Sequence, residues 1–469
     1  MAIKQVRNLP NNFLWGVASS AYQVEGCVDV DGRGPSVWDD YCRRPGAVFD
    51  GHSGREGCDH YRRYKEDVDL ISNLGVHAYR FSLSWSRILP SGRGQVNSKG
   101  LDFYKNLVDA LLEKNVQPWI TLFHWDFPSE LFFQGGWLNR DSASWFADYT
   151  QIVCEALSDR VEHWITLNEP QCFLGLGHYL EIHAPGLRYS KADLLRATHH
   201  SLLAHGKAVQ VLRSSARQKP IIGWSPVGWV SYPATDSPED IEAARQAMFS
   251  IDPAKKAWPL NNTWYSDPVI LGHYPEDGLK IFEADLPPIE SGDLKVISEP
   301  LDFYGVNIYH GAPISRSVSS EEPEVKNQRE LGHPLTLMGW TVDPQALYWG
   351  PKFLYERYKL PIYVTENGVA AMDWVNAKGK VDDAPRVDFM DRYIGQLSAA
   401  VADGTDVRGY FLWSIMDNFE WELGYSRRFG LVYVDYQTFE RVPKTSYYWY
   451  KDLVASNGDV LTKEPAQLR

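Results

Sequence analysis

The sequence predicts an α/β fold, a single (β/α)₈ TIM barrel with elaborated βα loops. Eight short apolar or aromatic runs lack strict polar alternation, so they fit strands that are covered on both faces, as in parallel sheets. Segments with apolar residues at helical spacing lie between these runs. Strands that alternate with helices favour a parallel sheet, and eight such strands favour a closed barrel.

The eight predicted strands follow one another along the chain. They are Phe13–Ala18, Ala78–Ser82, Pro118–Leu122, Trp164–Leu167, Ile221–Ser225, Phe303–Asn307, Ile362–Thr365 and Gly409–Trp413. A doubly wound open sheet is the alternative, but no G-x-G-x-x-G motif follows the first strand.

Five helices are predicted from apolar residues spaced by three and four. They are Asp59–Leu74, Leu101–Lys114, Ser142–Leu157, Lys191–Ser214 and Pro385–Asp403. The polar segments 226–240, 284–300 and 315–340 are rich in Pro and Gly, and we interpret them as loop insertions. Because a barrel with long insertions can reach 469 residues, we expect one catalytic domain over residues 1–469.

Charge and cysteine content exclude several classes of protein. Asp and Glu number 60 against 47 Lys and Arg, a net charge of −13, whereas nucleic-acid-binding proteins present basic surfaces. No run approaches the roughly 18 apolar residues of a membrane span, and residues 1–8 lack the apolar segment of a signal peptide. The five cysteines are odd in number and form no C-x-x-C pair, which argues against a disulfide framework or a zinc site. We therefore expect a cytoplasmic protein with no nucleic-acid or membrane partner; the oligomeric state stays open.

Aromatic residues are unusually abundant, with 18 Trp, 26 Tyr and 19 Phe. Two interpretations stand. A large core buries aromatic side chains because each covers much area. Alternatively, some of them line a pocket that stacks flat apolar faces, such as those of sugar rings. Composition alone favours the core.

Polar residues gather where the predicted strands end, which is where barrel enzymes carry their chemistry. They are Gln23 and Glu25 after the first run, Arg80 in the second, His124, Trp125 and Asp126 after the third, Asn168 and Glu169 after the fourth, Asn307 and Tyr309 at the sixth, Glu366 at the seventh, and Trp413, Glu420 and Trp421 at the eighth. No H-E-x-x-H, Walker A, G-x-S-x-G or EF-hand motif is present, so no metal and no cofactor is expected. His199, His200 and His205 lack the spacing of metal ligands on one helix face and are interpreted as helix-packing or surface residues.

Two glutamates, Glu169 and Glu366, each end an apolar run and would point into one pocket. Two carboxyl groups across a small pocket are what glycoside hydrolysis requires, because one protonates the leaving oxygen while the other attacks or activates water. Two structural carboxylates in salt bridges are the other interpretation, and spacing alone does not choose between them.

Ordered motifs extend over roughly residues 8–455, nearly the whole chain. They are Phe13–Gly26, Gly34–Asp39, Tyr79–Ser82, Trp85–Pro90, His124–Asp126, Thr166–Pro170, Thr365–Gly368, Trp413–Trp421 and Arg428–Val432. In these motifs the chain resembles the family-1 glycoside hydrolases, specifically β-glucosidases. The resemblance implies a (β/α)₈ barrel and a retaining mechanism, with Glu366 in T-E-N-G as nucleophile and Glu169 in N-E-P as general acid and then base. Retaining enzymes hold these carboxyl groups about 5–5.5 Å apart.

The resemblance also implies the roles of the surrounding residues. Arg80, Asn307 and Tyr309 would support the two carboxyl groups. A further set would bind the sugar, with Asn168 at the 2-hydroxyl, Gln23 and Glu420 at the 4-hydroxyl, and Trp413 as the stacking floor. The complete set is Gln23, His124, Trp125, Asn168, Trp340, Trp413, Glu420, Trp421 and Phe429.

The aglycone entrance would be formed by Trp340 together with Gln171, Cys172 and Leu176. Family members often carry an aromatic residue where this chain has Gln171, so the leaving-group preference and the tolerance of product glucose stay open. Cys172 is interpreted as a small buried hydrophobe, with a reactive thiol as the alternative.

The expected substrates are small-molecule β-glucosides. We expect release of terminal β-D-glucosyl residues from cellobiose, short cello-oligosaccharides and aryl β-glucosides, with β-galactosides and β-fucosides as further substrates. A 6-phospho-β-glycosidase is disfavoured because Glu420 would repel the phosphate. A non-catalytic sugar-binding relative is disfavoured because both Glu169 and Glu366 are present.

Overall fold

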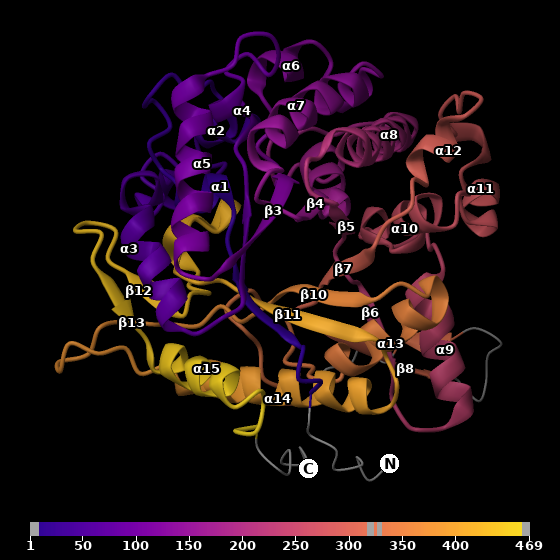
Figure 1. Ribbon diagram of the computed structural model, residues 1–469. Coiled ribbons are helices and arrows are strands. Elements are labelled where there is room, and N and C mark those ends of the chain that lie inside the picture. Colours follow the sequence, from indigo (N-terminus) through magenta and orange to yellow (C-terminus); the bar gives the residue numbers. More distant parts are fainter. Residues whose placement is uncertain (1–8, 317–322, 326–330, 462–469) are drawn as a thin grey trace.

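The computed structural model describes residues 9–316, 323–325 and 331–461, and its centre is a closed barrel of eight parallel strands (Figure 1). The barrel strands are β1 (Leu14–Ala18), β2 (Ala78–Ser82), β3 (Gln117–Phe123), β4 (His163–Asn168), β5 (Ile221–Ser225), β7 (Phe303–Asn307), β10 (Ile362–Asn367) and β11 (Val407–Trp413). Each strand pairs with its neighbours in chain order, and β11 closes onto β1. The predicted barrel is confirmed, and the doubly wound alternative is excluded.

The helices surround this barrel (Figure 1). They are α1 (Ala21–Val24), α2 (Val37–Cys42), α3 (His60–Asn73), α4 (Trp85–Ile88), α5 (Ser98–Glu113), α6 (Ser129–Phe133), α7 (Ser142–Leu157), α8 (Lys191–Ser215), α9 (Pro238–Phe249), α10 (Thr263–Ile270), α11 (Glu276–Ile281), α12 (Asp293–Ile297), α13 (Ala346–Tyr358), α14 (Ala384–Ala402) and α15 (Thr445–Ala455). The five predicted helices correspond to α3, α5, α7, α8 and α14, with ends that differ by three residues or fewer. Among the described residues, no helix has the length and apolar character needed to cross a membrane.

A second, smaller sheet corrects the interpretation of segments 226–240 and 315–340 as loops. It contains β6 (Val230–Pro233), β8 (Gly311–Arg316) and β9 (Pro323–Val325), in the order β6-β8-β9. Strand β6 has only four residues and pairs with β8 far along the chain, so no local pattern announces it. The loop prediction for 284–300 is also incomplete, because it contains α12. A two-stranded sheet, β12 (Val432–Val434) with β13 (Arg441–Pro443), follows the barrel.

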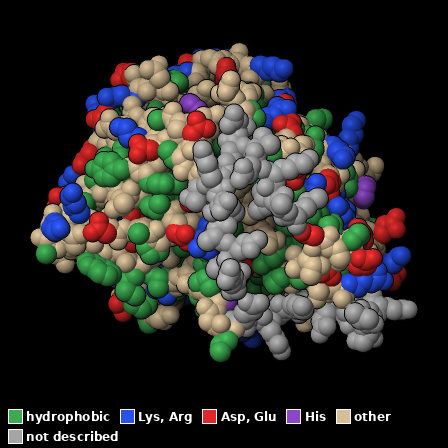
Figure 2. All heavy atoms as spheres, turned by 90° about the horizontal axis from the view of Figure 1, so that it is seen from below, with side chains coloured by type: hydrophobic (Ala, Val, Ile, Leu, Met, Phe, Trp, Pro, Cys, Tyr) green, Lys and Arg blue, Asp and Glu red, His purple; other side chains and the backbone are tan. Residues whose placement is uncertain are grey.

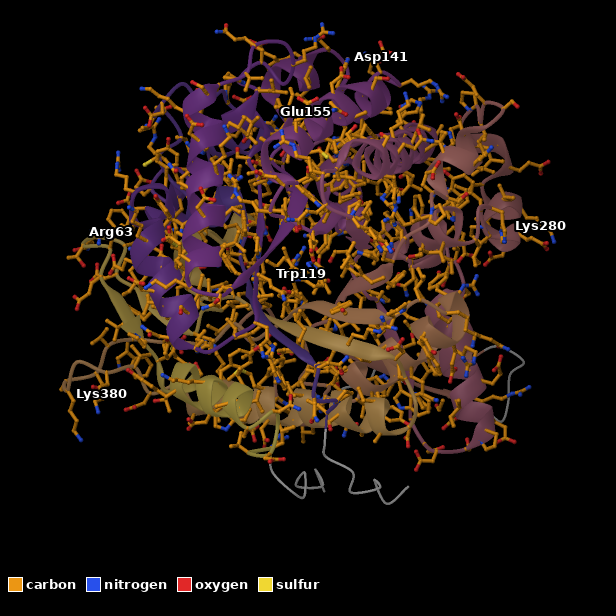
Figure 3. The ribbon with its side chains drawn as sticks, in the orientation of Figure 1. Arg63, Trp119, Asp141, Glu155, Lys280 and Lys380 are labelled. Atoms are coloured by element: carbon orange, nitrogen blue, oxygen red, sulfur yellow. The ribbon has the colours of Figure 1, made fainter. Side chains whose placement is uncertain are left out.

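Two apolar cores hold the fold together. The larger lies between the barrel and its helices, and the smaller fills the barrel interior. Trp119 on β3 is at the centre of the smaller core, with its ring 4.9 Å from both Tyr363 and Phe411. Figure 3 shows Trp119 in the middle of the molecule, with Lys280 and Lys380 at its periphery. Most of the aromatic side chains are buried in these two cores, as composition favoured.

Three expectations from the sequence concern the N-terminal segment, the cysteines and the charged surface. The N-terminal segment 1–8, on which the absence of a signal peptide was judged, lies outside the described residues. All five cysteines are free. On the face shown in Figure 2, the described acidic and basic side chains are interspersed.

Candidate active site

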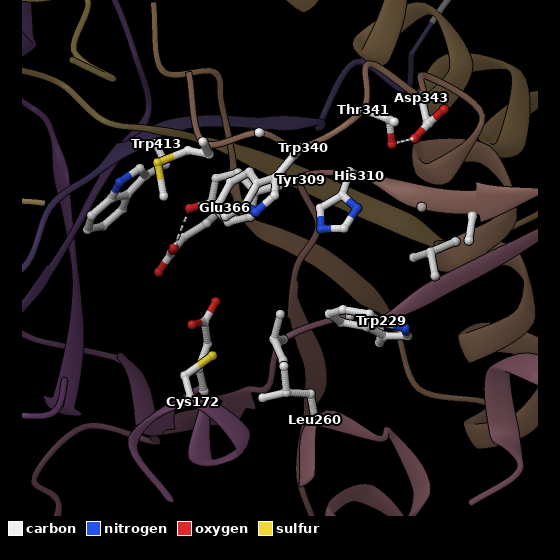
Figure 4. Close-up of a pocket in the computed structure, with 18 of the residues that line it drawn as sticks. Cys172, Trp229, Leu260, Tyr309, His310, Trp340, Thr341, Asp343, Glu366 and Trp413 are labelled. Carbon is white, nitrogen blue, oxygen red and sulfur yellow. Dashed lines mark hydrogen bonds between the residues drawn. The ribbon is translucent and has the colours of Figure 1, made fainter. Parts of the chain in front are cut away.

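The carboxyl ends of the barrel strands open into a cavity of about 1000 Å³ (Figure 4). Pockets of ~300–1,000 Å³ hold drug-sized ligands, so this cavity has room for more than one hexose. Glu169 and Glu366 both line it. The two glutamates that the strand ends singled out are therefore brought together.

Glu366 is the penultimate residue of β10, and its buried carboxyl group has two close donors. Arg80 on β2 donates from Nη1 to Oε1 at 2.6 Å, and the Tyr309 hydroxyl donates to Oε2 at 2.7 Å, the bond drawn dashed in Figure 4. Arg80 Nη1 also donates to the carbonyl oxygen of Thr365, the residue before Glu366. Because its two oxygens are held by different donors, the carboxyl group is fixed in one orientation.

Glu169 follows the last residue of β4 and is also buried. Its φ of 45° lies in the left-handed region, and its N–H donates to the carbonyl of Ser225 at 2.7 Å. The π-helix η3 (Cys172–Tyr179) begins directly after this turn. A backbone conformation that non-glycine residues rarely adopt, at the start of a π-helix, is typical of a functional site.

Asn307 at the end of β7 connects the two glutamates. Its Oδ1 accepts hydrogen bonds from the hydroxyls of Ser225 and Thr365, at 2.9 and 2.7 Å. Its Nδ2 must therefore point the other way, and it donates to Glu169 Oε1 at 2.8 Å. The same amide group lowers the pKa of Glu366, so Asn307 acts on both carboxyl groups.

The two carboxyl groups have different electrostatic surroundings. Burial and the neighbouring Glu366 raise the pKa of Glu169 to about 8. Burial also raises the pKa of Glu366, but the attraction of Arg80 and the hydrogen bond from Tyr309 oppose this rise. Since Arg80 contacts Glu366 directly, we infer that Glu366 loses its proton first. One ionised and one protonated carboxyl group can attack a carbon and protonate a leaving oxygen in the same pocket.

His124 and Glu420 present unused polar atoms in the cavity. Asn168 Nδ2 donates to His124 Nε2 at 3.1 Å, so the imidazole proton is on Nδ1. Burial and Arg80 hold the pKa of His124 well below its usual value, so the ring is neutral. His124 Nδ1 and Glu420 Oε2 are buried without a hydrogen-bond partner among the described residues. Buried polar atoms are rarely left unpaired, so both are suited to ligand hydroxyl groups.

Aromatic rings form the walls around these groups. The ring of His124 is stacked with those of Trp413, at 5.7 Å, and Trp421, at 5.9 Å. Trp125 lies 4.5 Å from Trp421. The cavity is also lined by other residues of the predicted set, Tyr309, Trp340, Phe429, Cys172 and Leu176.

Five predicted site residues do not line the cavity. Arg80 and Asn307 lie behind the two glutamates, as supporting residues would. Asn168 is buried, and its Oδ1 accepts from Arg80 Nη2 at 2.6 Å and from Asn307 at 3.0 Å. Gln23 is buried, and its Nε2 donates to Asn418 and to the carbonyl of Phe419.

Gln171 requires a correction. It was expected at the aglycone entrance, but its side chain is fully buried. Its Nε2 donates to the carbonyl of Val227 at 3.1 Å, and its Oε1 accepts from the N–H of Val227 at 3.3 Å. These two bonds connect Gln171 to Val227, which does line the cavity, so Gln171 can affect the entrance through Val227. The chain turns into η3 at this point, and that turn carries the side chain inward.

Sequence reasoning missed Trp229 and His310, which line the outer part of the cavity. Trp229 is in segment 226–240, which we interpreted as a loop. The available signal was an aromatic residue just after the fifth strand, where the loops of a barrel line its site.

The three histidines of α8 are packing residues. His199 lies between Tyr274 and Asp293, His200 contacts the carbonyl of Trp137, and His205 contacts Thr166. All three are buried, which decides between the two interpretations. Among the described residues, no three His, Cys, Asp or Glu side chains are placed to hold a metal ion.

Comparison with known proteins gives similarity over nearly the full length. The chain matches the profile described as Glycosyl hydrolase family 1 over residues 5–459. Beta-glucosidase A of Thermotoga maritima is 43% identical over 454 residues, covering 97% of this chain and 99% of the relative. The 1,4-beta-D-glucan glucohydrolase of Thermotoga neapolitana is 43% identical over 457 residues, covering 97% and 99%. The solved structure of the Thermotoga maritima β-glucosidase in complex with glucoimidazole is similar with a TM-score of 0.87 at 43% identity, covering 97% of this chain and 100% of the other.

Proposed function

The chain belongs to glycosyl hydrolase family 1, and from this premise we propose that it is a retaining, exo-acting β-glucosidase that releases terminal non-reducing β-D-glucosyl residues. The sequence motifs indicated a resemblance to the β-glucosidases of this family, and the comparisons confirm it. The observation that carries the proposal is the asymmetric pair of carboxyl groups, with Arg80 and Tyr309 on Glu366 and a pKa raised to about 8 on Glu169.

In the first step, the ionised Glu366 attacks C1 of the glucosyl unit while Glu169 gives its proton to the glycosidic oxygen. The bond between C1 and that oxygen breaks, the aglycone leaves as an alcohol, and a covalent glycosyl–enzyme ester forms. Tyr309 and Arg80 hold Glu366 in the rotamer that attacks, which reduces the entropy cost of reaching the transition state.

In the second step, Glu169 acts as a base. The negative charge on Glu366 is consumed when the ester forms, so one cause of the raised pKa of Glu169 disappears. Glu169 then takes a proton from water, the water oxygen attacks C1, and the ester to Glu366 breaks. Two displacements at C1 retain the β-configuration.

The glucosyl unit would bind at the end of the cavity that contains Trp413 and Trp421. We assign the stacking floor to Trp413, and we assign contacts with the hydroxyl groups to His124 Nδ1 and to Glu420. Asn168 supports this site through His124 and Arg80, and a contact with the 2-hydroxyl through its remaining N–H is part of the proposal. Gln23 is proposed at the 4-hydroxyl through Oε1, which accepts one hydrogen bond from Ser20 and retains a second lone pair.

A neutral sugar is favoured over a 6-phosphorylated one. No Lys or Arg is among the described residues that line the cavity, so a phosphate group would have no cation to pair with. Burial and nearby carboxylates raise the pKa of Glu420 well above its usual value, and an added phosphate would raise it further.

The proposed substrates are cellobiose, short cello-oligosaccharides and aryl β-glucosides. β-Galactosides and β-fucosides are included because a galactosyl unit differs from a glucosyl unit only in the configuration at C4, and a D-fucosyl unit is a galactosyl unit that lacks the 6-hydroxyl. We propose that residues 1–469 form one catalytic domain, since the family match and the barrel strands extend over most of the chain.

Hydrolysis of an aryl β-glucoside followed by proton NMR tests the proposal. We expect β-glucose as the first sugar product, followed by slow conversion to the α-anomer. If α-glucose appears first, the mechanism is inverting and the assignment of Glu366 as nucleophile is wrong. If only the 6-phosphate form of the substrate is cleaved, the substrate class is wrong.

A further inference from the structure

The cavity continues well beyond the two glutamates. Its outer part is lined by Trp229, His310, Tyr232 and Asp343. Figure 4 shows Trp413 and Glu366 at one end, Trp229 toward the other, and His310 and Leu260 on opposite sides between them. A volume of about 1000 Å³ is at the upper end of the range for ligand pockets. A single glucosyl unit and a small aglycone would leave this outer part empty.

A row of aromatic rings connects the two ends. Tyr309, which contacts Glu366, lies 5.3 Å from Trp340, and Trp340 is stacked with His310 at 5.4 Å. His310 lies 5.7 Å from Trp229, edge to face. These distances are those of rings in contact, so the row forms a continuous aromatic surface from the side of Glu366 to Trp229, and this surface is long enough for more than one sugar ring.

Trp229 is exposed but fixed in place. Trp229 is 41% exposed to solvent, an unusually large fraction for a tryptophan. The backbone N–H of Trp229 donates to Asn262 Oδ1 at 3.1 Å, and the backbone carbonyl of Trp229 accepts from Asn262 Nδ2 at 2.9 Å. Asn262 is itself buried and also donates to the carbonyl of Met248. An aromatic side chain on a backbone held in this way is pre-organised to bind a ligand.

Polar groups accompany the aromatic surface at the outer end. Among the described residues, none forms a hydrogen bond with the imidazole of His310, and burial lowers its pKa, so the ring is neutral. Tyr232 donates to Asp343 at 3.0 Å, and His333 lies 3.6 Å from the same carboxylate. A flat apolar surface with polar groups at its edges fits a sugar ring, whose faces carry C–H groups and whose edge carries hydroxyl groups. A purely apolar aglycone would leave the imidazole of His310 without a partner, because Tyr232 and Asp343 already bond each other.

We propose that Trp229, with His310, forms a distal subsite that binds the glucosyl unit located two positions beyond the scissile bond of a β-gluco-oligosaccharide. This inference rests on the proposed function, because it adds a chain-length preference to the same site. The first two glucosyl units would lie between Trp413 and Trp340, and only a third would reach Trp229.

Substrates of different length test the distal subsite. In Trp229→Ala, we expect kcat/KM for cellotriose and cellotetraose to fall about tenfold, the effect of losing one aromatic contact. We expect kcat/KM for cellobiose and for p-nitrophenyl β-glucoside to change less than twofold. Trp229→Phe keeps a flat ring and should retain most of the activity on cellotriose. Trp374→Ala is the matched control, because Trp374 is also exposed but does not line the cavity.

Two outcomes would overturn the subsite. An equal loss on all four substrates would mean that Trp229 has only a structural role, and no loss on any substrate would mean that no sugar binds there. Failure of the proposed function is distinguishable, because the unmodified protein would then be inactive on cellobiose and on the aryl glucoside.

Discussion

Arg80 Nη1 lies 2.6 Å from Glu366 Oε1, and both side chains are buried. The same guanidinium donates from Nη2 to Asn168 and from Nε to Thr121, so it is fixed on three sides. A buried cation in direct contact with one carboxyl group, but not with the other, makes the two glutamates chemically unequal. The predictions on Glu366 and Glu169 follow from this inequality.

Glu366→Gly should abolish the hydrolysis of aryl β-glucosides, by at least about a thousandfold, because the first displacement lacks its nucleophile. Azide fits the space left by the side chain and should restore turnover by attacking C1 directly. The product to identify by NMR is the α-glucosyl azide. Glu440→Gly changes an exposed glutamate outside the cavity and should keep normal activity. A β-glucosyl azide would contradict a nucleophilic role for Glu366.

Glu169→Ala should separate substrates by leaving group. Loss of the acid should reduce kcat about a hundredfold or more on cellobiose, whose leaving oxygen needs a proton. The first displacement on 2,4-dinitrophenyl β-glucoside should be much less affected, because that phenolate leaves without protonation. A burst of dinitrophenol in stopped-flow absorbance would identify the accumulated glycosyl–enzyme. An equal loss of the burst rate and of cellobiose turnover would exclude Glu169 as the acid.

The pH dependence of kcat/KM should have an alkaline limb near pH 8. Glu169 must be protonated in the free enzyme, and its pKa is raised to about 8, so activity falls as the pH rises through that value. In Glu366→Gln the neighbouring charge is absent, so the pKa of Glu169 should fall. Carbon-13 NMR of the Glu169 carboxyl group in both proteins gives this difference directly. An unchanged pKa would mean that burial alone sets its value.

The strands could be predicted because each barrel strand is covered on both faces, and uninterrupted apolar runs such as Ala78–Ser82 reflect that burial. The ends of the predicted strands then identified Glu169 and Glu366 as candidate site residues. The small sheet that carries β6 and β8 could not be predicted, since its pairing joins residues such as Val230 and Gly311 that are distant in the sequence.

The direction in which a side chain points was the second feature that could not be predicted from the sequence. Residues 169, 171 and 172 follow one strand closely, yet Glu169 and Cys172 line the cavity while Gln171 points to the backbone of Val227. A π-helix begins there, and its irregular turn cannot be read from residue type. Trp229 was missed for the same reason, because its indole reaches the cavity from a segment beyond a strand end.

Asp126→Asn should alter the pH dependence of stability. Asp126 is fully buried, no Lys or Arg forms an ion pair with it among the described residues, and burial raises its pKa to about 8. Its protonated form is therefore favoured by folding. The free energy of unfolding therefore includes a stabilising contribution from the protonated Asp126. This contribution is complete below about pH 4, the pKa of an unfolded aspartate, and is lost as the pH rises through about 8.

Urea unfolding at pH 5 and at pH 9 measures this effect. Wild type should lose more stability than Asp126→Asn between the two values, because the amide does not titrate. Asp102→Asn changes an exposed aspartate and should follow wild type. If Asp126→Asn and wild type lose the same stability, the carboxyl group is already ionised at pH 5.

Lys444→Met should destabilise the protein and also weaken sugar binding. The Lys444 ammonium group is completely buried, and its Nζ donates to Asp373 and to Asp417 at 2.6 Å each. Asp417 in turn accepts from Arg428 at 2.7 Å and from the N–H of Gly430 at 2.9 Å. Removing the ammonium group leaves two carboxylates buried near each other, and losing one partner of a buried ion pair costs about 3–5 kcal/mol.

The effect on binding follows from where these contacts lie. Asp417, Arg428 and Gly430 belong to the segment after β11 that also carries Glu420 and Trp421, so KM for cellobiose should rise more than kcat falls. Lys380→Met, a change at the periphery of the molecule (Figure 3), is the control and should alter neither stability nor KM. Urea unfolding and steady-state kinetics on the same samples give both quantities. A loss below about 1 kcal/mol in Lys444→Met would mean either that Arg386 and Arg428, which also pair with Asp373 and Asp417, compensate for the lysine, or that the two carboxyl groups bind protons. A stability loss that rises with pH would identify the protonation.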